Sequence, residues 1–247
     1  MNILELKGVS FSYTSEVFIK DLDMSIGEAS LSGLIGPNGS GKSTIMKIAS
    51  GILRPVAGAV LLWGKDIGLY KGRDRAKLIS YLPQLLDTQL PFTVQELVSM
   101  GAYPYSIPPE LTVQKAMELV GLEDASESLI TELSGGEKRR AFIAMTLLQG
   151  AGLILLDEPL ANLDIRYQVE LMKLLKRLRD EKGISILMAL HDINLIHHFD
   201  NLFVVKEGKL VAHGTPQEIA TGDLLSEVYG VDITIYPQEE GRFLFGF

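Results

Sequence analysis

A glycine-rich segment near the N-terminus has the residue types that bind phosphate. Gly36-Pro-Asn-Gly-Ser-Gly-Lys42-Ser43 matches the pattern G-x-x-x-x-G-K-[ST], between an apolar run, Ser30 to Ile35, and a segment of helical character, Ser43 to Ser50. Glycines allow successive N–H groups to converge on one anion, and the following helix adds the positive end of its dipole. The pattern predicts a nucleotide site, although Gly36 to Gly39 alone could be a plain turn. The residues expected to contact the phosphates or a magnesium ion beside them are Gly36, Pro37, Asn38, Gly39, Ser40, Gly41, Lys42 and Ser43. Among them, Lys42 is expected to reach the β- and γ-phosphates, and the Ser43 hydroxyl to ligate Mg²⁺.

Two acidic residues follow a short apolar run. Leu153 to Leu156 leads directly into Asp157 and Glu158. Such a run ends at the carboxyl edge of a parallel sheet, where open α/β sheets bind ligands. Neighbouring residues of a strand point to opposite sides, so the two acids are expected to have different tasks. We predict that Asp157 holds Mg²⁺ and that Glu158 polarises the attacking water; a solvated acidic pair before Pro159 is the alternative.

A histidine and a glutamine are further candidates for the same edge. His191 follows the apolar run Ile184 to Leu190, which places it at the end of another strand, on the same edge as Asp157. There it is expected to hydrogen-bond the γ-phosphate and orient the water, whereas a lone histidine at a strand end is usually structural. Gln84 begins an irregular region and, taken alone, is a loop residue.

A second helix start also has anion-binding character. In Leu133-Ser-Gly-Gly-Glu137, Ser134 and Glu137 have the spacing of a capping box. The functional interpretation adds an anion site made by Ser134 and the N–H groups of Gly135 and Gly136. Both interpretations can hold together.

The elements that must position these residues alternate between strands and helices. This alternation indicates an α/β fold, with Leu153 to Leu156 and Ile184 to Leu190 as strands buried on both faces of a parallel sheet. Further strands are expected at Asp21 to Ile26, Ser30 to Ile35 and Ala59 to Trp63, and longer helices at Glu137 to Leu148 and Ile165 to Leu178. We expect one domain: a nucleotide-binding core of residues 1–85 and 151–230, a helical insertion of residues 86–150, and a tail of strands at 231–247.

Composition excludes several kinds of function. The 247 residues carry 23 positive and 31 negative side chains, a net charge of −8, and no cysteine. The absence of cysteine rules out disulfides and thiolate chemistry, and the acidic balance argues against nucleic-acid binding. The short basic cluster Lys138-Arg139-Arg140 is expected to be a solvated helix face. No run approaches the roughly 18 apolar residues of a membrane-spanning helix, and the N-terminus lacks signal-peptide features.

Taken in order, these motifs resemble the nucleotide-binding subunit of ATP-binding cassette (ABC) transporters. The match covers nearly the whole chain: Tyr13, Gly36 to Thr44, Gln84, Leu133 to Glu137, Leu153 to Glu158, Leu163-Asp164 and His191. The resemblance implies a P-loop NTPase core with a mostly parallel sheet, an antiparallel β subdomain and an inserted helical subdomain. It also implies ATP hydrolysis with Mg²⁺.

The resemblance assigns further roles to single residues. Tyr13 is similar to the aromatic that stacks on adenine, with Phe11 and Phe18 as alternatives, and Thr44 lies beside the phosphates. Gln84 corresponds to the residue that links Mg²⁺ and the attacking water to the helical insertion. Ser134, Gly135, Gly136, Glu137 and Asp164 would face a nucleotide held by a second copy, so that two chains sandwich two ATP molecules.

The same resemblance implies membrane partners. A cassette without a membrane segment is similar to an importer subunit that works at the cytoplasmic face of the membrane as a peripheral protein, with a polytopic permease and a substrate-binding protein. Cassettes of iron-siderophore, haem and cobalamin importers are the most similar group; zinc or manganese importers, a soluble cassette ATPase acting on DNA or the ribosome, and a nucleotide switch without turnover are the alternatives. The segment expected to receive a permease helix contains Leu85, Leu86, Leu90, Phe92, Val94, Leu97, Val98, Met100, Tyr103 and Tyr105.

Overall fold

The computed structural model describes residues 1–86, 89, 91–107, 110–161, 163–237 and 243–246. Its strands are β1 (Asn2–Phe11), β2 (Ile19–Gly27), β3 (Leu31–Ile35), β4 (Ala57–Leu62), β5 (Lys65–Asp66), β6 (Ile79–Leu82), β7 (Leu153–Asp157), β8 (Ser185–Ala189), β9 (Asn201–Lys206), β10 (Lys209–Gly214), β11 (Thr234–Pro237) and β12 (Phe243–Gly246). Its α-helices are α1 (Lys42–Ala49), α2 (Gly72–Leu78), α3 (Val94–Ser99), α4 (Val113–Glu118), α5 (Gly135–Leu148), α6 (Ile165–Lys182), α7 (Pro216–Ile219) and α8 (Gly222–Tyr229). Short 3₁₀ helices are η1 (Ile67–Leu69), η2 (Met100–Ala102), η3 (Glu123–Ala125), η4 (Ile130–Glu132) and η5 (Ile193–His198).

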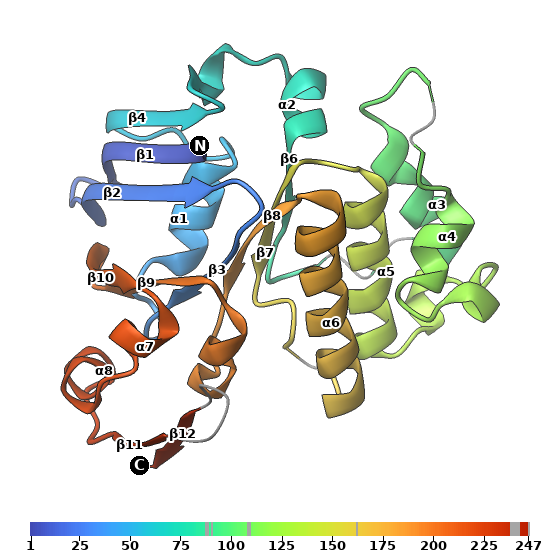
Figure 1. The fold of residues 1–247 in the computed structure, drawn as a ribbon. Helices are drawn as coiled ribbons and strands as arrows, with labels where there is room; N and C mark the ends of the chain where they lie inside the picture. The colour runs from blue at the N-terminus through green and yellow to red at the C-terminus, as the bar shows by residue number, and fades with distance from the viewer. Residues whose placement is uncertain (87–88, 90, 108–109, 162, 238–242, 247) are drawn as a thin grey trace.

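A six-stranded sheet forms the centre of the molecule, in the order β10-β9-β3-β8-β7-β6 (Figure 1). The strands from β9 to β6 are parallel, and β10 joins the edge in the antiparallel direction. Every residue of β3, β7 and β8 is buried, which explains why these strands are nearly continuous apolar runs rather than alternating ones. The expected parallel sheet is therefore confirmed.

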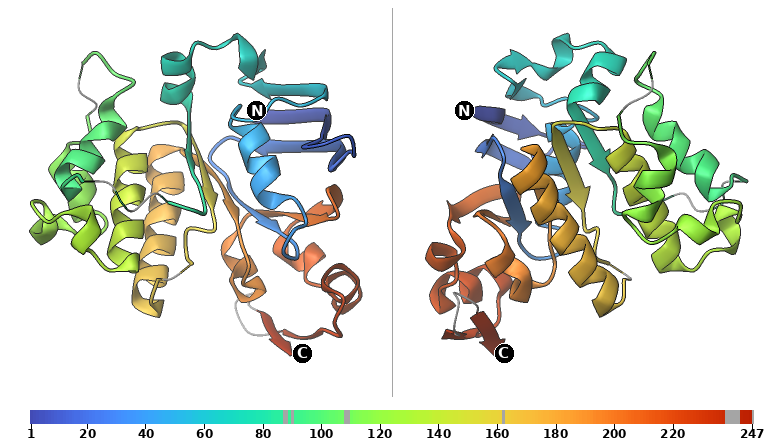
Figure 2. Two further views of the ribbon diagram at one scale, coloured as in Figure 1. Left: turned by 180° about the vertical axis from the view of Figure 1, so that it is seen from behind. Right: turned by 45° about the vertical axis from the view of Figure 1, so that its right-hand side comes forward.

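A second, antiparallel sheet packs on the first through α1. Its order is β2-β1-β4-β5, and the view from behind in Figure 2 shows α1 between the two sheets. One apolar cluster joins β1, β2, α1 and one face of the central sheet, and includes Leu6, Ile26, Ile45 and Leu155. The sequence patterns did not single out β1, which nevertheless holds this sheet together by pairing with both β2 and β4.

The other face of the central sheet is covered by helices. Helix α6 packs on β3 and β8, and α5 packs on α3 and α4, which lie at the right of Figure 1. A second apolar cluster fills this side and extends to the C-terminal strands, where Ile233 and Phe245 are buried. The prediction of strands in the tail is confirmed by the hairpin of β11 and β12. Within the described ranges, no helix is both long and apolar enough to cross a bilayer.

Candidate functional site

Four neighbouring parallel strands bring the predicted residues to one edge. Leu34 in β3 pairs with Ala189 in β8, Ala189 pairs with Asp157 in β7, and Leu156 pairs with Leu82 in β6. The carboxyl ends of these four strands therefore lie side by side at one edge of the sheet. The segment from Gly36, His191, Glu158 and Gln84 each follow one of the four strands within two residues, and Asp157 is the last residue of β7. The prediction that these distant segments meet is confirmed by this register.

The glycine-rich segment forms the floor of a cleft of about 370 Å³. The lining residues are Phe18, Asn38, Gly39, Ser40, Gly41, Lys42, Ser43, Thr44, Gln84, Glu158 and His191. Lys42 begins α1, and its Nζ donates to the carbonyls of Gly36 at 2.7 Å and Pro37 at 3.2 Å. Burial lowers the pKa of Lys42, and the nearby carboxylates of Glu158 and Asp157 oppose that shift. A cleft with helix N–H groups and an ammonium at its floor is suited to phosphate.

Two glycines fix the position of the phosphate loop. Gly36 has a φ of 150°, and a Cβ built on it would lie 2.0 Å from the carbonyl oxygen of Val205 in β9. Gly208, in the β9–β10 turn, donates its N–H to the Ser40 carbonyl at 2.8 Å, and a Cβ there would lie 1.7 Å from the Phe18 carbonyl oxygen. No side chain fits at either position without displacing backbone, so the loop is held against the C-terminal strands.

The Glu158 carboxylate is the centre of a three-residue cluster. The His191 Nε2 lies 2.6 Å from Glu158 Oε1, and the Gln84 side-chain amide donates to Glu158 Oε2. Glu158 is buried, and its φ of 53° is a left-handed conformation that costs a non-glycine residue about 1–2 kcal/mol. Strain of this kind is often found at functional sites. The structure thus brings together the three residues that the sequence analysis proposed as catalytic.

Asp157 has the features of a metal ligand. It is buried at the end of β7, and its Oδ2 accepts a hydrogen bond from the Tyr81 hydroxyl at 3.2 Å. Its Oδ1 is buried and has no hydrogen-bond partner among the described residues. A carboxylate oxygen left unpaired in this way suits a hard cation such as Mg²⁺, so the residues present fit the predicted ion.

Phe18 lines the cleft, Tyr13 contacts the lining residue Thr44, and Phe11 does neither. Tyr13 is exposed, lies two residues after the end of β1, and its hydroxyl is 3.0 Å from Thr44 Oγ1. Its ring meets Phe11 edge-on with the centroids 4.8 Å apart, and Phe18 at 5.9 Å. Phe11 is buried in the core, which removes it as a stacking surface, whereas Tyr13 and Phe18 both remain candidates.

The residues that are expected to face a nucleotide on a second copy lie outside this cleft. The predicted capping box at Ser134 is formed: the Ser134 N–H donates to Glu137 Oε2 at 2.9 Å, and the Glu137 N–H donates to Ser134 Oγ at 3.3 Å. The Ser134 hydroxyl also donates to Glu137 Oε2, at 2.6 Å, and this hydrogen bond, followed by the one from the Ser134 N–H, lowers the pKa of Glu137. Gly135 and Gly136 form the first turn of α5, and Asp164 caps α6 by accepting from the Tyr167 N–H at 3.1 Å. None of these residues lines the cleft of its own chain.

The prediction of a solvated basic face at Lys138-Arg139-Arg140 is wrong for the two arginines. Arg139 and Arg140 are only 5 % and 6 % exposed, because backbone carbonyls from neighbouring loops surround both guanidinium groups. Arg139 contacts the backbone of Asp157 and Glu158. The charge pattern of the sequence does not reveal this burial, since the acceptors are backbone carbonyls, which every residue has.

The sequence patterns also did not single out Tyr81 as a neighbour of the site. Tyrosine is a common residue in β-strands, so its presence in β6 gives no signal of a special role.

Comparison with known proteins agrees with this geometry. The family model described as ABC transporter matches residues 19–161. The chain is 40 % identical to the iron(3+)-hydroxamate import ATP-binding protein FhuC of Bacillus subtilis (strain 168), over 95 % of this chain and 90 % of that protein. It is 37 % identical to the petrobactin import ATP-binding protein FpuC of Bacillus anthracis (98 % and 92 %), and 35 % identical to the hemin import ATP-binding protein HmuV of Rhodopseudomonas palustris (strain BisB5) (96 % and 94 %).

Solved structures show the same architecture. The cbiO1 subunit from Clostridium perfringens superposes with a TM-score of 0.77 at 31 % identity, over 92 % of this chain and 93 % of that one. The bacterial ABC transporter cassette MJ0796, solved as a dimer, gives 0.76 at 25 % identity (86 % and 98 %). The chain belongs to the ABC transporter family. It is an ATP-binding subunit of the importer type and an ATPase, with the P-loop NTPase fold.

Proposed function

We propose that this ATPase powers the import of an iron-carrying solute, an iron-siderophore complex or haem, as a peripheral subunit at the cytoplasmic face of the membrane. The support for the solute comes from relatives that are named for iron(3+)-hydroxamate, petrobactin and hemin import. Deleting the chain from its host is expected to abolish uptake of one of these iron compounds. Unimpaired uptake of all of them would contradict this solute class.

The cluster of Glu158 with Gln84 and His191 in the phosphate cleft supports the proposed mechanism. ATP binds with its phosphates on Gly36 to Thr44 and its adenine beside Tyr13. The Glu158 carboxylate, held between Gln84 and His191, accepts a proton from the water that attacks the γ-phosphate. His191 hydrogen-bonds the γ-phosphate and orients the water, and Lys42 offsets the charge of the β- and γ-phosphates.

Asp157, Ser43 and Gln84 are the proposed ligands for Mg²⁺. The unpaired Oδ1 of Asp157 supports this assignment. When bound, the ion would neutralise charge on the phosphate oxygens. The Tyr81 hydroxyl orients the other oxygen of Asp157.

A second copy of the chain completes the site. Ser134, Gly135, Gly136, Glu137 and Asp164 do not line the cleft of their own chain, and a related cassette was solved as a dimer. A two-fold arrangement lets the α5 N-terminus of one copy bind the γ-phosphate held by the other, with two ATP molecules in the interface. ATP favours this closed state only through the contacts it makes there, so hydrolysis reopens it.

The permease would dock on the segment after Gln84. In this segment Val94, Leu97 and Val98 are buried and belong to the core, whereas Leu85, Met100 and Tyr103 are exposed. Leu90 lies outside the described residues. Leu85, next to Gln84, and Met100 and Tyr103, on the segment that packs against the C-terminal end of α5, support a contact for a permease helix, with a substrate-binding protein delivering the solute.

Replacement of Glu158 by glutamine tests the mechanism. Because a general base contributes about 10²–10⁴ in rate, Glu158→Gln is expected to reduce steady-state hydrolysis by about that factor while ATP affinity remains. With its γ-phosphate intact, ATP should then hold the closed dimer, which light scattering detects. The matched control is Glu118→Gln on α4, an exposed glutamate paired with Lys115, which should hydrolyse ATP normally. Unchanged turnover in Glu158→Gln, or a monomer with MgATP, would contradict the proposal.

A further inference from the structure

Arg139 is a buried cation that bonds almost entirely to backbone. It lies in α5, and its guanidinium donates to five carbonyl oxygens of two different loops. The acceptors are the carbonyls of Pro83, Gln84, Asp157, Glu158 and Pro159. Among the described residues, no carboxylate lies within ion-pair distance of Arg139. The contacts therefore fix the geometry of two loops rather than pair one charge with another.

The two loops are those that carry the proposed catalytic groups. Nη1 donates to the Gln84 carbonyl at 2.7 Å, and Nη2 donates to the carbonyls of Asp157 at 2.8 Å and Glu158 at 2.5 Å. The rigid planar fork of an arginine can hold several acceptors at fixed relative positions. Arg139 thus ties the loop after β6 to the loop after β7.

The backbone of Glu158 is the part of this network under strain. Its φ of 53° places a non-glycine residue in the left-handed region. The Asp157 and Glu158 carbonyls belong to the two peptide planes that flank the φ and ψ rotations of Glu158, and both accept from one nitrogen of Arg139. Holding both planes fixes this conformation and so the direction of the carboxylate, which meets the Gln84 amide and His191.

We propose that Arg139 is a positioning residue for ATP hydrolysis, which holds Glu158 in its left-handed turn and Gln84 beside it so that the carboxylate faces the phosphate cleft. The inference rests on the proposed role of Glu158 as the base. It also joins the catalytic backbone to α5, the helix that Ser134 caps. Contact of Ser134 with a nucleotide on the second copy would then act on the same rigid helix that holds Glu158.

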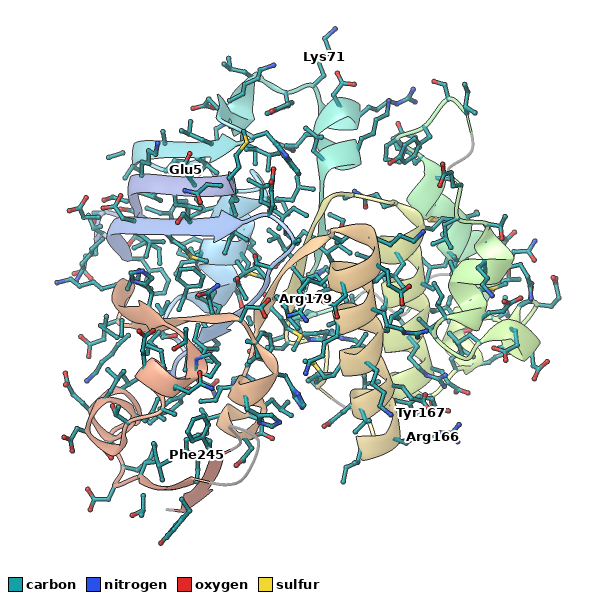
Figure 3. All side chains as sticks on the ribbon, in the orientation of Figure 1. Glu5, Lys71, Arg166, Tyr167, Arg179 and Phe245 are labelled. Atoms are coloured by element: carbon teal, nitrogen blue, oxygen red, sulfur yellow. The ribbon has the colours of Figure 1, made fainter. Side chains whose placement is uncertain are left out.

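Arg140 provides a matched control on the same helix. It is equally buried, and its Nη1 donates to the carbonyls of Val120 and Gly121, both at 2.7 Å. Its guanidinium lies 3.8 Å from the ring centroid of Tyr167, which Figure 3 labels near the start of α6. It hydrogen-bonds to no residue of the Glu158 cluster within the described part of the chain. Replacing Arg140 therefore removes a similar set of buried hydrogen bonds but does not directly affect the loops that carry Gln84 and Glu158.

The test compares Arg139→Gln, Arg139→Lys, Arg140→Gln and Glu158→Gln in the full-length purified chain. Steady-state kinetics give kcat and KM for MgATP, a fluorescent ATP analogue gives the affinity, and thermal melting gives the folded fraction. Because small misplacement of a reacting group costs up to about a hundredfold, Arg139→Gln should lower kcat by at least about tenfold. Its KM and ATP affinity should stay near those of the wild type.

Arg139→Lys should recover part of the loss in kcat, since an ammonium keeps the charge and up to three donors. Arg140→Gln should melt earlier yet keep the wild-type kcat per folded molecule.

The outcomes separate the two proposals. Loss of turnover in Glu158→Gln together with a wild-type kcat in Arg139→Gln would refute the positioning role and leave Glu158 as the base. Full turnover in Glu158→Gln would refute the base and the positioning role together. If Arg139→Gln does not fold, Arg139→Lys decides: a kcat and KM equal to those of the wild type would overturn the inference.

Discussion

At the scale of single residues, Tyr81 is an unexpected neighbour of the proposed magnesium site. Burial, followed by the negative charge of Asp157 and the hydrogen bond to it, raises the pKa of Tyr81. The hydroxyl therefore stays protonated and donates to Asp157 Oδ2. It leaves Oδ1 as the oxygen without a hydrogen bond among the described residues, so Tyr81, which does not line the cleft, affects which oxygen is open to the proposed metal ion.

Tyr81→Phe should reveal this hydrogen bond through the pH dependence of stability. Near pH 7 the wild type is expected to be more stable by about 1 kcal/mol, the usual contribution of one hydrogen bond. A pKa raised in the folded state means that stability is lost as pH rises above about 10, where the unfolded tyrosine ionises. The phenylalanine variant lacks that loss, so the difference between the two proteins should shrink above this pH. Urea denaturation at pH 8, 10 and 11 measures it; a constant or growing difference would show that Tyr81 is not the protonated donor.

At the scale of elements, the same capping box begins two helices for which different roles are proposed. Helix α5 begins with the Ser134–Glu137 capping box, and α7 begins with Thr215 and Glu218 in the same arrangement, where the Thr215 N–H donates to Glu218 Oε2 at 2.7 Å. Each box satisfies N–H groups that a helix start leaves unpaired. Only the α5 start is proposed to meet a nucleotide, so comparing the two separates capping from ligand binding.

Ser134→Ala and Thr215→Ala should therefore lose similar stability but differ in assembly. Each is expected to cost about 1 kcal/mol, the typical contribution of an N-cap side chain. In the Glu158→Gln background, only Ser134→Ala should also weaken the dimer formed with MgATP. Denaturation curves give the first quantity and light scattering across an ATP titration gives the second. Equal dimer formation by both variants would mean that the Ser134 hydroxyl acts only as a cap.

At the scale of the whole molecule, the exposed side chains of Leu85 and Tyr103 contrast with a well-filled interior. Leu85 is 87 % exposed and Tyr103 70 % exposed, while both faces of the central sheet are covered by apolar clusters. Tyr103 also lies under the guanidinium of Arg73, 4.9 Å from the ring centroid. These features are consistent with a surface that a membrane partner covers.

Single-cysteine cross-linking can test this surface, because the chain contains no cysteine of its own. Tyr103→Cys and Met100→Cys are expected to form adducts with a co-purified polytopic membrane protein after treatment with a thiol cross-linker. Val211→Cys on β10, also exposed, should form none. The absence of adducts from every position tested between residues 85 and 105 would exclude this docking site.

The fold and the site differ in how far the sequence predicts them. Apolar runs that end in Asp157, His191 and Gly36 indicate parallel strands, and the carboxyl ends of such strands share an edge, so these residues could be expected to meet. Strand β1 has no comparable signal, because polar residues interrupt its apolar ones and its buried positions do not form one continuous run. Arg139 could not be predicted either, since its acceptors are carbonyls brought together only by the completed fold.

The lack of space at Gly208 has a consequence for motion within the chain. Its N–H is bound to the phosphate loop, its carbonyl accepts from Lys20 at 3.0 Å, and its α-carbon faces the Phe18 carbonyl with no room for a methyl group. Gly208 thus holds the phosphate loop, the start of β2 and the β9–β10 turn together at one residue. A displacement of the phosphate loop would therefore act directly on the β9–β10 turn.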